Sequence, residues 1–324
     1  MTSPSQSAPG VCPWRIIFMG TPEFAVPCLQ ALIDGPDEVV AVVAQPDRPS
    51  GRGNKLQSPP TIQLARAHQI PTLQAEKVRV PAFRDALAAF QPDLMVVVAY
   101  GRILTEAVLN VPLHGCINVH ASLLPKYRGA APIQWSVLRG EHETGVTTMK
   151  MDVGLDTGDM LLKRTLELGP ELTAGALHDL LAPVGAALLL ETVAQLKQGL
   201  LHPTPQDHAA ATLAPMLKKE DGLIDWRRPA RELDWHVRGM TPWPSAYTFL
   251  EKGARLTVLK GRPLSDTSAL EPGQVVSAQA DGLVVATGEG LYRIEMLKPE
   301  NGKAMLAGAW LNGHPVPVGA RLGA

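Results

Sequence analysis

Asn-Val-His-Ala-Ser-Leu-Leu-Pro-Lys-Tyr-Arg, residues 118–128, is the stretch that decides the fold, because an apolar run ends there in a group of polar side chains. On a strand, Asn118 and His120 point to the same side, since strand side chains alternate with a period of two. In sheets of parallel strands, ligands bind beyond the carboxyl ends of the strands. We therefore expect both side chains at a ligand-binding edge of such a sheet.

Short apolar, β-branched runs recur along the first 120 residues and are typical of strands buried on both faces. These runs are Ile16–Phe18, Val39–Val43, Leu94–Val98 and Ile117–Val119. Helical patterns lie between them, at Pro22–Ile33, Thr61–Gln69 and Pro81–Phe90. The alternation predicts an α/β fold with a doubly wound, Rossmann-like parallel sheet.

The sequence pattern changes twice in the rest of the chain. Strand patterns at Thr144–Asp152 and Asp159–Arg164 precede a long helical pattern at Thr173–Gln198. A Pro- and His-rich stretch without periodicity then separates this helix from short β-type runs between turn residues, which predict a small antiparallel barrel. We expect a disordered tail at 1–13, an α/β domain at 14–198, a linker at 199–217 and a β domain at 218–324.

Composition narrows the class of protein. The 324 residues carry a formal net charge of −1, which disfavours binding of nucleic acid over the whole surface but leaves room for a local basic patch. Three cysteines without paired spacing predict neither a disulfide framework nor a zinc site. A reactive thiol at Cys116 is the alternative. The apolar stretches look too short or too interrupted to span a bilayer, and no secretory signal is expected.

The chemistry of residues 118–128 points to transfer of an acyl-type group. The amide of Asn118 can donate a hydrogen bond to an oxygen that gains charge, and His120 can hold or release a proton near neutral pH. An acidic segment follows, and its Asp152, Asp156 and Asp159 compete as partners of the histidine. Taken singly, an asparagine here is more often a turn former and a histidine more often structural.

Several motifs together resemble the folate-dependent formyltransferases over residues 14–324. The residues that carry the resemblance are Asn118-x-His120, Ser122-Leu-Leu-Pro125, Leu155-Asp-Thr-Gly158, Phe18-Met-Gly-Thr-Pro-Glu-Phe24, Gln45–Gly53, Arg128–Gln134 and Pro242-Trp-Pro244. The resemblance implies a formyltransferase fold with an OB-like C-terminal domain. The implied reaction moves the formyl group of 10-formyltetrahydrofolate, a co-substrate, to the α-amino group of methionine on charged initiator tRNA, in translation initiation without a metal.

The resemblance also implies roles for particular residues. Asn118, His120 and Asp156 form the expected catalytic set, in which the carboxylate stabilises the protonated imidazole. The segment Ser122, Leu123, Leu124 and Pro125 is the expected folate contact, with leucines as apolar walls and core packing as the alternative.

The basic stretch from Gln45 to Pro60 is the expected tRNA contact. It lacks periodicity, which predicts a mobile loop near the ligand-binding edge. Arg52 is the main candidate, with Lys55 and Arg48 behind it, and a purely solvated loop is the alternative.

Two other functions compete with this one. A formyltransferase acting on a small amine would share the catalytic residues, but the basic loop speaks against it. A non-enzymatic RNA-binding protein would not need Asn118, His120 and Asp156 intact. We expect a cytoplasmic monomer whose partners are formyl-folate and initiator methionyl-tRNA, and no membrane.

Overall fold

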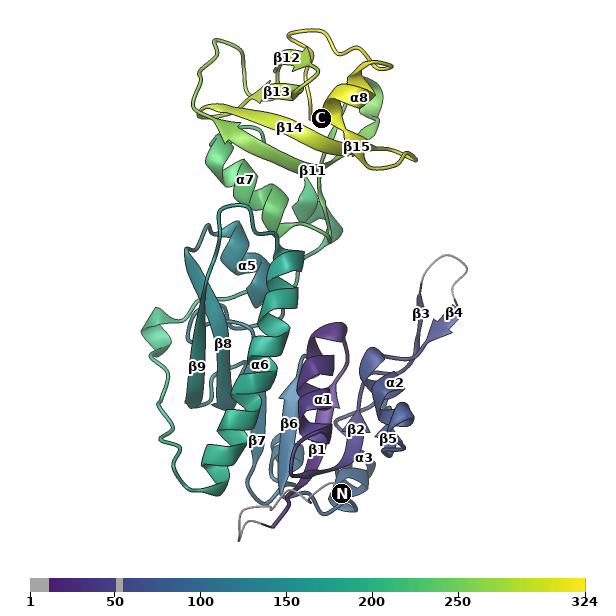
Figure 1. Cartoon of the computed structure of the whole chain (residues 1–324), viewed down its shortest axis with the longest axis vertical. Helices are drawn as coiled ribbons and strands as arrows, with labels where there is room; N and C mark the ends of the chain where they lie inside the picture. The colour runs from purple at the N-terminus through teal and green to yellow at the C-terminus, as the bar shows by residue number, and fades with distance from the viewer. Residues whose placement is uncertain (1–11, 51–54, 324) are drawn as a thin grey trace, which may run out of the picture. The chain divides into compact units, whose positions relative to one another are not determined.

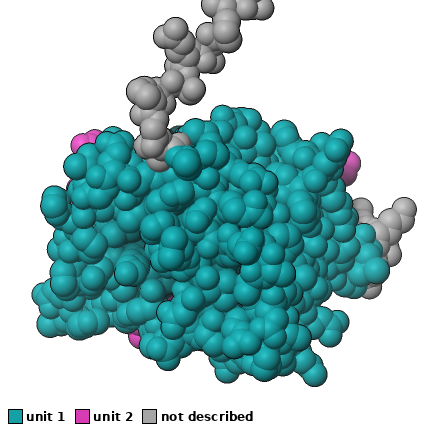
Figure 2. Space-filling model, turned by 90° about the horizontal axis from the view of Figure 1, so that it is seen from below, with its two compact units in different colours: residues 1–128, 145–165, 180–212 teal, residues 129–144, 166–179, 213–324 magenta. Residues whose placement is uncertain are grey.

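The computed structural model describes residues 12–50 and 55–323, so nearly all of the predicted tail lies outside the described part. The chain forms two compact units, coloured separately in Figure 2. Unit 1 comprises residues 1–128, 145–165 and 180–212, and unit 2 comprises residues 129–144, 166–179 and 213–324. Each unit therefore draws on segments that are far apart in the sequence.

A seven-stranded sheet forms the middle of unit 1, in the order β5-β2-β1-β6-β7-β8-β9 (Figure 1). The strands are β1 (Arg15–Gly20), β2 (Glu38–Val43), β5 (Thr72–Leu73), β6 (Leu94–Val98), β7 (Cys116–His120), β8 (Glu143–Lys150) and β9 (Met160–Glu167). Strands β5, β2, β1, β6 and β7 run parallel to one another, and β8 runs antiparallel to β7. The predicted Rossmann-like sheet is confirmed, with an antiparallel extension beyond β7.

Helices cover both faces of this sheet. On one face, α3 (Pro81–Ala88) and α4 (Glu106–Leu109) share a buried apolar cluster with alternate residues of β1, β2 and β6. On the other face, α1 (Val26–Ile33) packs with α2 (Pro60–Ala67) and follows a short 3-10 helix, η1 (Glu23–Ala25). Cys116 belongs to the α3 and α4 face, so alternation assigns Asn118 and His120 to that face as well.

The long helix α6 (Ala174–Lys197) lies against the opposite side of β7 (Figure 1). A Cβ at Gly185 of α6 would lie 3.1 Å from the side chain of Val119 of β7, which is a tight contact, so glycine permits this close approach. By length and composition α6 is apolar enough to cross a membrane, which contradicts the expectation from sequence. Half of the apolar stretch of this helix is buried inside the structure, and core helices of folded proteins share this composition.

The basic stretch after β2 is a β-hairpin and not the irregular loop that its composition predicts. Strands β3 (Arg48–Ser50) and β4 (Lys55–Gln57) pair antiparallel, and residues 51–54 between them lie outside the described part. Asp47 closes the base, because it accepts hydrogen bonds from Gln74 at 2.6 Å and Ser58 at 2.8 Å. The bond from Gln74, followed by that from Ser58, lowers the pKa of Asp47, so this carboxylate stays charged at neutral pH.

Unit 2 contains a six-stranded antiparallel sheet of order β10-β11-β14-β13-β12, with β15 on β14. Its strands are β10 (Ala246–Phe249), β11 (Arg255–Leu264), β12 (Val275–Gln279), β13 (Gly282–Ala286), β14 (Leu291–Pro299) and β15 (Met305–Leu306). The predicted antiparallel β domain is confirmed.

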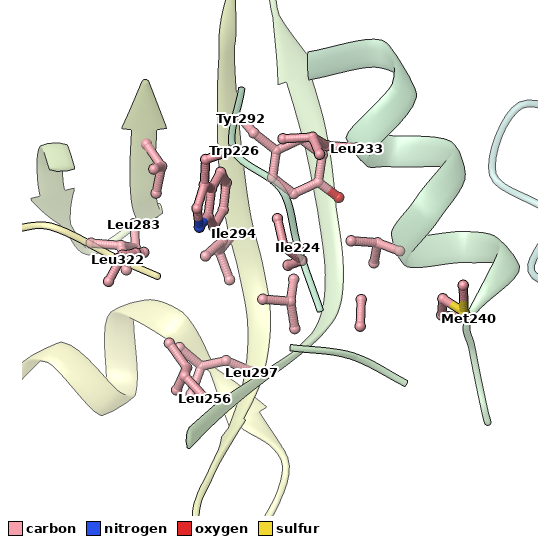
Figure 3. Packing of buried hydrophobic residues seen from close by; sticks show 14 of the residues in the cluster. Ile224, Trp226, Leu233, Met240, Leu256, Leu283, Tyr292, Ile294, Leu297 and Leu322 are labelled. Carbon is pink, nitrogen blue, oxygen red and sulfur yellow. The ribbon is translucent and has the colours of Figure 1, made fainter. Parts of the chain in front are cut away.

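Helices of unit 2 complete its apolar core. Helix α7 (Ala230–Gly239) places Leu233 beside Trp226 and Tyr292 (Figure 3), and α8 (Ala307–Leu311) adds Trp310. The earlier helix α5 (Pro132–Leu138) joins the same core through Leu138. Helix α7 was not predicted, although its buried residues recur at helical spacing after Pro229.

Replacing Asp37 by asparagine should destabilise unit 1 strongly. The side chains of Asp37 and Lys197 form an ion pair and are only 4% and 8% exposed, and Asp37 also accepts from the backbone N–H of Trp14 at 2.8 Å. Asp37→Asn keeps the size but leaves Lys197 buried without its counter-ion. We expect the free energy of unfolding, measured by urea titration, to fall by about 3–5 kcal/mol.

The matched control is an exposed pair between β1 and β2. Arg15 and Glu38 contact at 3.2 Å, but their side chains are 43% and 62% exposed. Glu38→Gln should cost about 1 kcal/mol or less. Equal losses in the two variants would show that burial of the Asp37 pair does not govern its contribution.

Candidate active site

Three side chains converge where β7 ends: Asn118 and His120 from the strand, and Asp156 from the turn between β8 and β9. The Asn118 amide donates to Oδ1 of Asp156 at 3.4 Å, and Nδ1 of His120 lies 3.7 Å from Oδ2. The side chains of His120 and Asp156 are 6% and 14% exposed. One carboxylate therefore faces both polar groups of the strand, in surroundings that screen charge weakly.

The imidazole of His120 is fixed by its second nitrogen. Nε2 lies 2.9 Å from the carbonyl oxygen of Tyr127, and a carbonyl only accepts, so Nε2 carries a proton. Nδ1, which faces Asp156, is then the nitrogen whose proton can come and go. The ring is thus oriented from one side by the backbone and from the other by a carboxylate.

Of the three competing aspartates, Asp156 is the one that reaches His120. Asp152 instead accepts from the hydroxyl of Thr157 at 2.7 Å and from the N–H of Gly154 at 3.0 Å, which ties the turn together. Asp156 itself has a φ of 52°, the left-handed region that aspartate adopts more readily than most residues.

A glycine is required where the turn rejoins the sheet. A Cβ at Gly158 would lie within 1.8 Å of the carbonyl oxygen of Lys150, closer than any two such atoms can approach. This contact explains the glycine of the Asp-Thr-Gly motif without a direct chemical role.

Two side chains behind the turn were not singled out from the sequence. Gln206 donates to the carbonyl oxygens of Asp156 and Gly158 at 2.8 and 2.7 Å, and accepts from the guanidinium of Arg128. Gln206 lies in the stretch expected to be a linker, where no periodicity marks a buried residue. Arg128 belongs to a quoted motif, but its partner is 78 residues away in the sequence.

The predicted folate segment, Ser122 to Pro125, divides into buried and partly exposed residues. Ser122 is fully buried and donates to the carbonyl oxygen of Lys126 at 2.6 Å. Leu124 is 1% exposed and packs with Met149 and Met160, as the core alternative predicts. The side chains of Leu123 and Pro125 are the partly exposed members.

A lysine stands beside this segment. The ammonium group of Lys163 donates to the carbonyl oxygen of Leu124 at 2.6 Å. Partial burial lowers the pKa of this lysine. The contact fixes the backbone of the segment from the side of β9.

The predicted tRNA-binding residues are only partly described. Arg48 begins β3 and is exposed, and Lys55 begins β4. Arg52 lies outside the described residues. The hairpin strands that carry Arg48 and Lys55 are held at their base by Asp47, as described above.

Basic residues between positions 218 and 238 of unit 2 are mostly engaged with neighbouring side chains. Arg227 pairs with Asp225, Arg228 with Glu232, and Arg238 with Asp234. The guanidinium of Arg231 lies 4.9 Å from the ring centre of Trp235. Lys218 and Lys219 are exposed.

Cys116 is not a reactive thiol. It is buried, its thiol donates to the carbonyl oxygen of Leu109 at 3.5 Å, and burial raises its pKa to about 12. The thiolate is the nucleophilic form, so this residue is inert at neutral pH. Within residues 12–50 and 55–323, no group of three or more His, Cys, Asp or Glu side chains is arranged to hold a metal ion.

Comparison with known families gives two matches that together span most of the chain. Residues 14–193 match the formyl transferase model, and residues 216–315 match the model for the formyl transferase C-terminal domain. The methionyl-tRNA formyltransferase of Desulfotalea psychrophila is 54% identical over 310 residues, covering 96% of this chain and 94% of its own. The methionyl-tRNA formyltransferase of Geobacter sulfurreducens is 50% identical over 309 residues, covering 95% and 96%.

Solved structures share the fold at low identity. WlaRD, a sugar 3N-formyl transferase crystallised in the presence of dTDP and 5-N-formyl-THF, superposes with a TM-score of 0.65 at 15% identity, covering 90% of this chain and 99% of its own. HypX from Aquifex aeolicus, in complex with tetrahydrofolic acid, gives a TM-score of 0.60 at 16% identity over 93% of this chain. The present chain spans 47% of HypX.

Proposed function

The chain belongs to the formyl transferase family, alongside the methionyl-tRNA formyltransferases, and we propose that it transfers the formyl group of 10-formyltetrahydrofolate to the α-amino group of methionine on charged initiator tRNA. The observation that carries the proposal is the carboxylate of Asp156, which faces both Asn118 and His120. The reaction supplies formylated initiator tRNA for translation initiation.

The proposed catalytic step begins when the neutral amine attacks the formyl carbon. The carbonyl oxygen gains charge as the tetrahedral intermediate forms, and the amide of Asn118 donates a hydrogen bond to it. The second donor is Nδ1–H of the protonated His120, because Nε2–H is held by the carbonyl of Tyr127 while Nδ1 lies 3.7 Å from Asp156, beyond hydrogen-bond distance. Donors of this kind are already oriented by Asp156 and by the carbonyl of Tyr127, so little reorganisation accompanies the reaction. This orientation favours the transition state over the bound substrate.

The proton of the attacking amine must leave and the folate nitrogen must gain one. We assign the acceptor to the Asp156–His120 pair, directly or through a water, because Nδ1 of the ring faces the carboxylate. The bond from the formyl carbon to N10 then breaks as N10 receives a proton. The products are formyl-methionyl-tRNA and tetrahydrofolate, and the pair returns to its starting protonation state.

Residues 122–125 are our candidate for the folate contact. Leu123 and Pro125 offer partly exposed apolar surface, while Ser122 and Leu124 hold the segment in shape from within. This division refines the expectation that both leucines act as walls, because the side chain of Leu124 belongs to the core.

The hairpin of β3 and β4 is our candidate for the tRNA contact. Arg52→Ala should lower kcat/KM for charged initiator tRNA by about tenfold, since a charge-assisted bond to phosphate contributes on the order of 1.5–3 kcal/mol. The loss should shrink as salt rises, because part of the contribution comes from counterion release. Steady-state formylation kinetics at two salt concentrations measure both effects, and Arg52→Lys should rescue only in part if the contact is forked.

An exposed arginine elsewhere in unit 1 gives the control for Arg52. Arg84 on α3 pairs with its neighbour Asp85 on the surface, and Arg84→Ala should leave the tRNA kinetics unchanged. Unchanged kinetics of Arg52→Ala at low salt would remove the hairpin from the proposal.

One assay separates the competing functions. Purified protein is supplied with formyl-folate and either charged initiator tRNA or small amines such as an aminosugar nucleotide. We expect formylation of the tRNA and not of the small amines; the reverse would identify a small-amine enzyme, and no transfer a binding protein. We further propose that the enzyme acts as a cytoplasmic monomer with no membrane partner, which size-exclusion chromatography and fractionation of cells test.

A further inference from the structure

The segment 204–212, which we call the strap, contacts the backbone of the turn that carries Asp156. It begins where Thr204 pairs with Met160 of β9 through backbone hydrogen bonds of 2.8 and 2.9 Å. At its end, Thr212 accepts from the backbone N–H of Tyr127 through its hydroxyl and from that of Arg128 through its carbonyl. The strap therefore supports the backbone on both sides of the active site.

Gln206 is the residue of the strap that contacts the catalytic turn. The two protons of its amide go to the carbonyl oxygens of Asp156 and Gly158, and its oxygen accepts from Nε and Nη2 of Arg128 at 3.0 and 2.7 Å. All four hydrogen-bonding positions of the amide are engaged, which fixes its orientation. If the amide of Gln206 were reversed, its oxygen would face the two backbone carbonyl oxygens, and its N–H groups would face the N–H groups of Arg128.

Burial makes this arrangement rigid. Gln206 and Arg128 are each 6% exposed, and a third guanidinium nitrogen lies 3.2 Å from Nδ1 of His208 on η2 (His208–Ala210). Removing one partner of a buried polar group destabilises a folded protein much more than removing one partner of a surface group. The guanidinium of Arg128 therefore fixes the amide oxygen of Gln206. The amide protons of Gln206 then fix the backbone of the catalytic turn at Asp156 and Gly158.

The turn needs such support, because Asp156 occupies the left-handed backbone region at φ 52°. Non-glycine residues stay in that region when surrounding contacts enforce it. The two carbonyls that Gln206 binds belong to Asp156 itself and to the residue two positions later. A shift of this backbone would move the carboxylate away from Asn118 and His120.

We infer that Gln206 is a positioning residue for formyl transfer, which holds the carboxylate of Asp156 in its catalytic place through the backbone of the turn. The inference rests on the proposed function, since it presumes that Asp156 takes part in the reaction. The hydrogen bonds of Gln206 go to Arg128 and to the backbone of Asp156 and Gly158, so its effect is exerted through the turn.

Gln206→Glu tests the donor protons specifically. The variant keeps the length of the side chain and its acceptor for Arg128, but sets a carboxylate oxygen against two carbonyls. We expect kcat to fall by about tenfold or more, because small misplacements of a catalytic group carry large rate losses. KM for formyl-folate should change by about twofold or less, since ground-state binding does not depend on Asp156.

The control is the same substitution at a glutamine with similar backbone contacts. Gln274 donates to the carbonyl oxygen of Gly319 at 3.3 Å and accepts from the N–H of Glu271 at 2.8 Å. Gln274→Glu should leave kcat unchanged. If Gln206→Glu does not fold, Gln206→Met is used, which lacks donors and fits the same length. It should show the same fall in kcat and faster amide hydrogen exchange in residues 152–158.

A double-mutant cycle separates positioning from general damage. In an Asp156→Asn background, Gln206→Glu should cause little further loss of kcat, because both changes disable the same group. A full and additive loss, or a wild-type kcat in the Gln206 variants, overturns the inference while leaving the role of Asp156 intact. Wild-type turnover of Asp156→Asn alone overturns the proposed role of Asp156 and the inference together.

Discussion

His120→Ala and Asn118→Ala should each lower kcat for formylation of charged initiator tRNA by about 10²-fold or more. Each change removes one donor to the developing oxyanion, and one such donor typically contributes on the order of 10²–10³ in rate. His120→Ala also removes the ring that exchanges a proton with Asp156. The binding of formyl-folate should change much less, because both groups act mainly on charge that develops during the reaction. Single-turnover kinetics with equilibrium binding of folate measure the two quantities separately.

Residues of the same types away from the site provide the controls. His202 and Asn110 are both exposed, and their alanine variants should turn over at the wild-type rate. Near-normal turnover of a folded His120→Ala or Asn118→Ala enzyme would refute the catalytic assignment. A parallel loss of folate binding would instead indicate that these residues shape the pocket.

Asp156→Asn should also lower kcat by about 10²-fold, the lower range for loss of a general acid or base. The amide has the size of the carboxylate but cannot accept a proton or stabilise a protonated imidazole. Asparagine also tolerates the left-handed backbone at φ 52°, so the turn should keep its shape. Stopped-flow or quench-flow assays of formyl transfer measure this loss.

Asp159→Asn is the matched control for Asp156. Asp159 stands in the same segment and competes with Asp156 in the sequence, but its observed contact is a backbone carbonyl that accepts from Lys150 at 2.9 Å. Its variant should keep wild-type turnover. A large loss at Asp159 with none at Asp156 would mean that the wrong carboxylate has been assigned.

The fold was largely predictable because its signals are local. Runs such as Leu94–Val98 are entirely buried strands, and their apolar, β-branched character predicts this without further information. The same holds for Asn118 and His120, since alternation along one strand brings them to one face. The pairing with Asp156 followed from family resemblance, because spacing alone left Asp152 and Asp159 as competitors.

The missed features depend on contacts between distant segments. Gln206 is 50 residues from Asp156 and 78 from Arg128, and its own neighbourhood carries no periodic pattern. The β3–β4 hairpin was not predicted, because its composition is that of a solvated loop. Its base is closed by hydrogen bonds of Asp47 with Ser58 and Gln74, which the composition does not indicate. Hydrogen bonds of buried polar groups leave no repeating signature in a sequence.

The position of helix α5 limits where the chain can be divided into two fragments. The helix precedes β8 in the sequence, yet Leu138 belongs to the core that Leu233 and Val237 of α7 help to form. A cut anywhere between residues 198 and 218 would separate α5 from that core, although the sequence looks like a boundary there. The carboxyl-terminal fragment would then expose apolar surface of α7 to water and should aggregate unless the other fragment is made with it. Evolution by exchange of whole domains is therefore harder for this chain than its two family matches suggest.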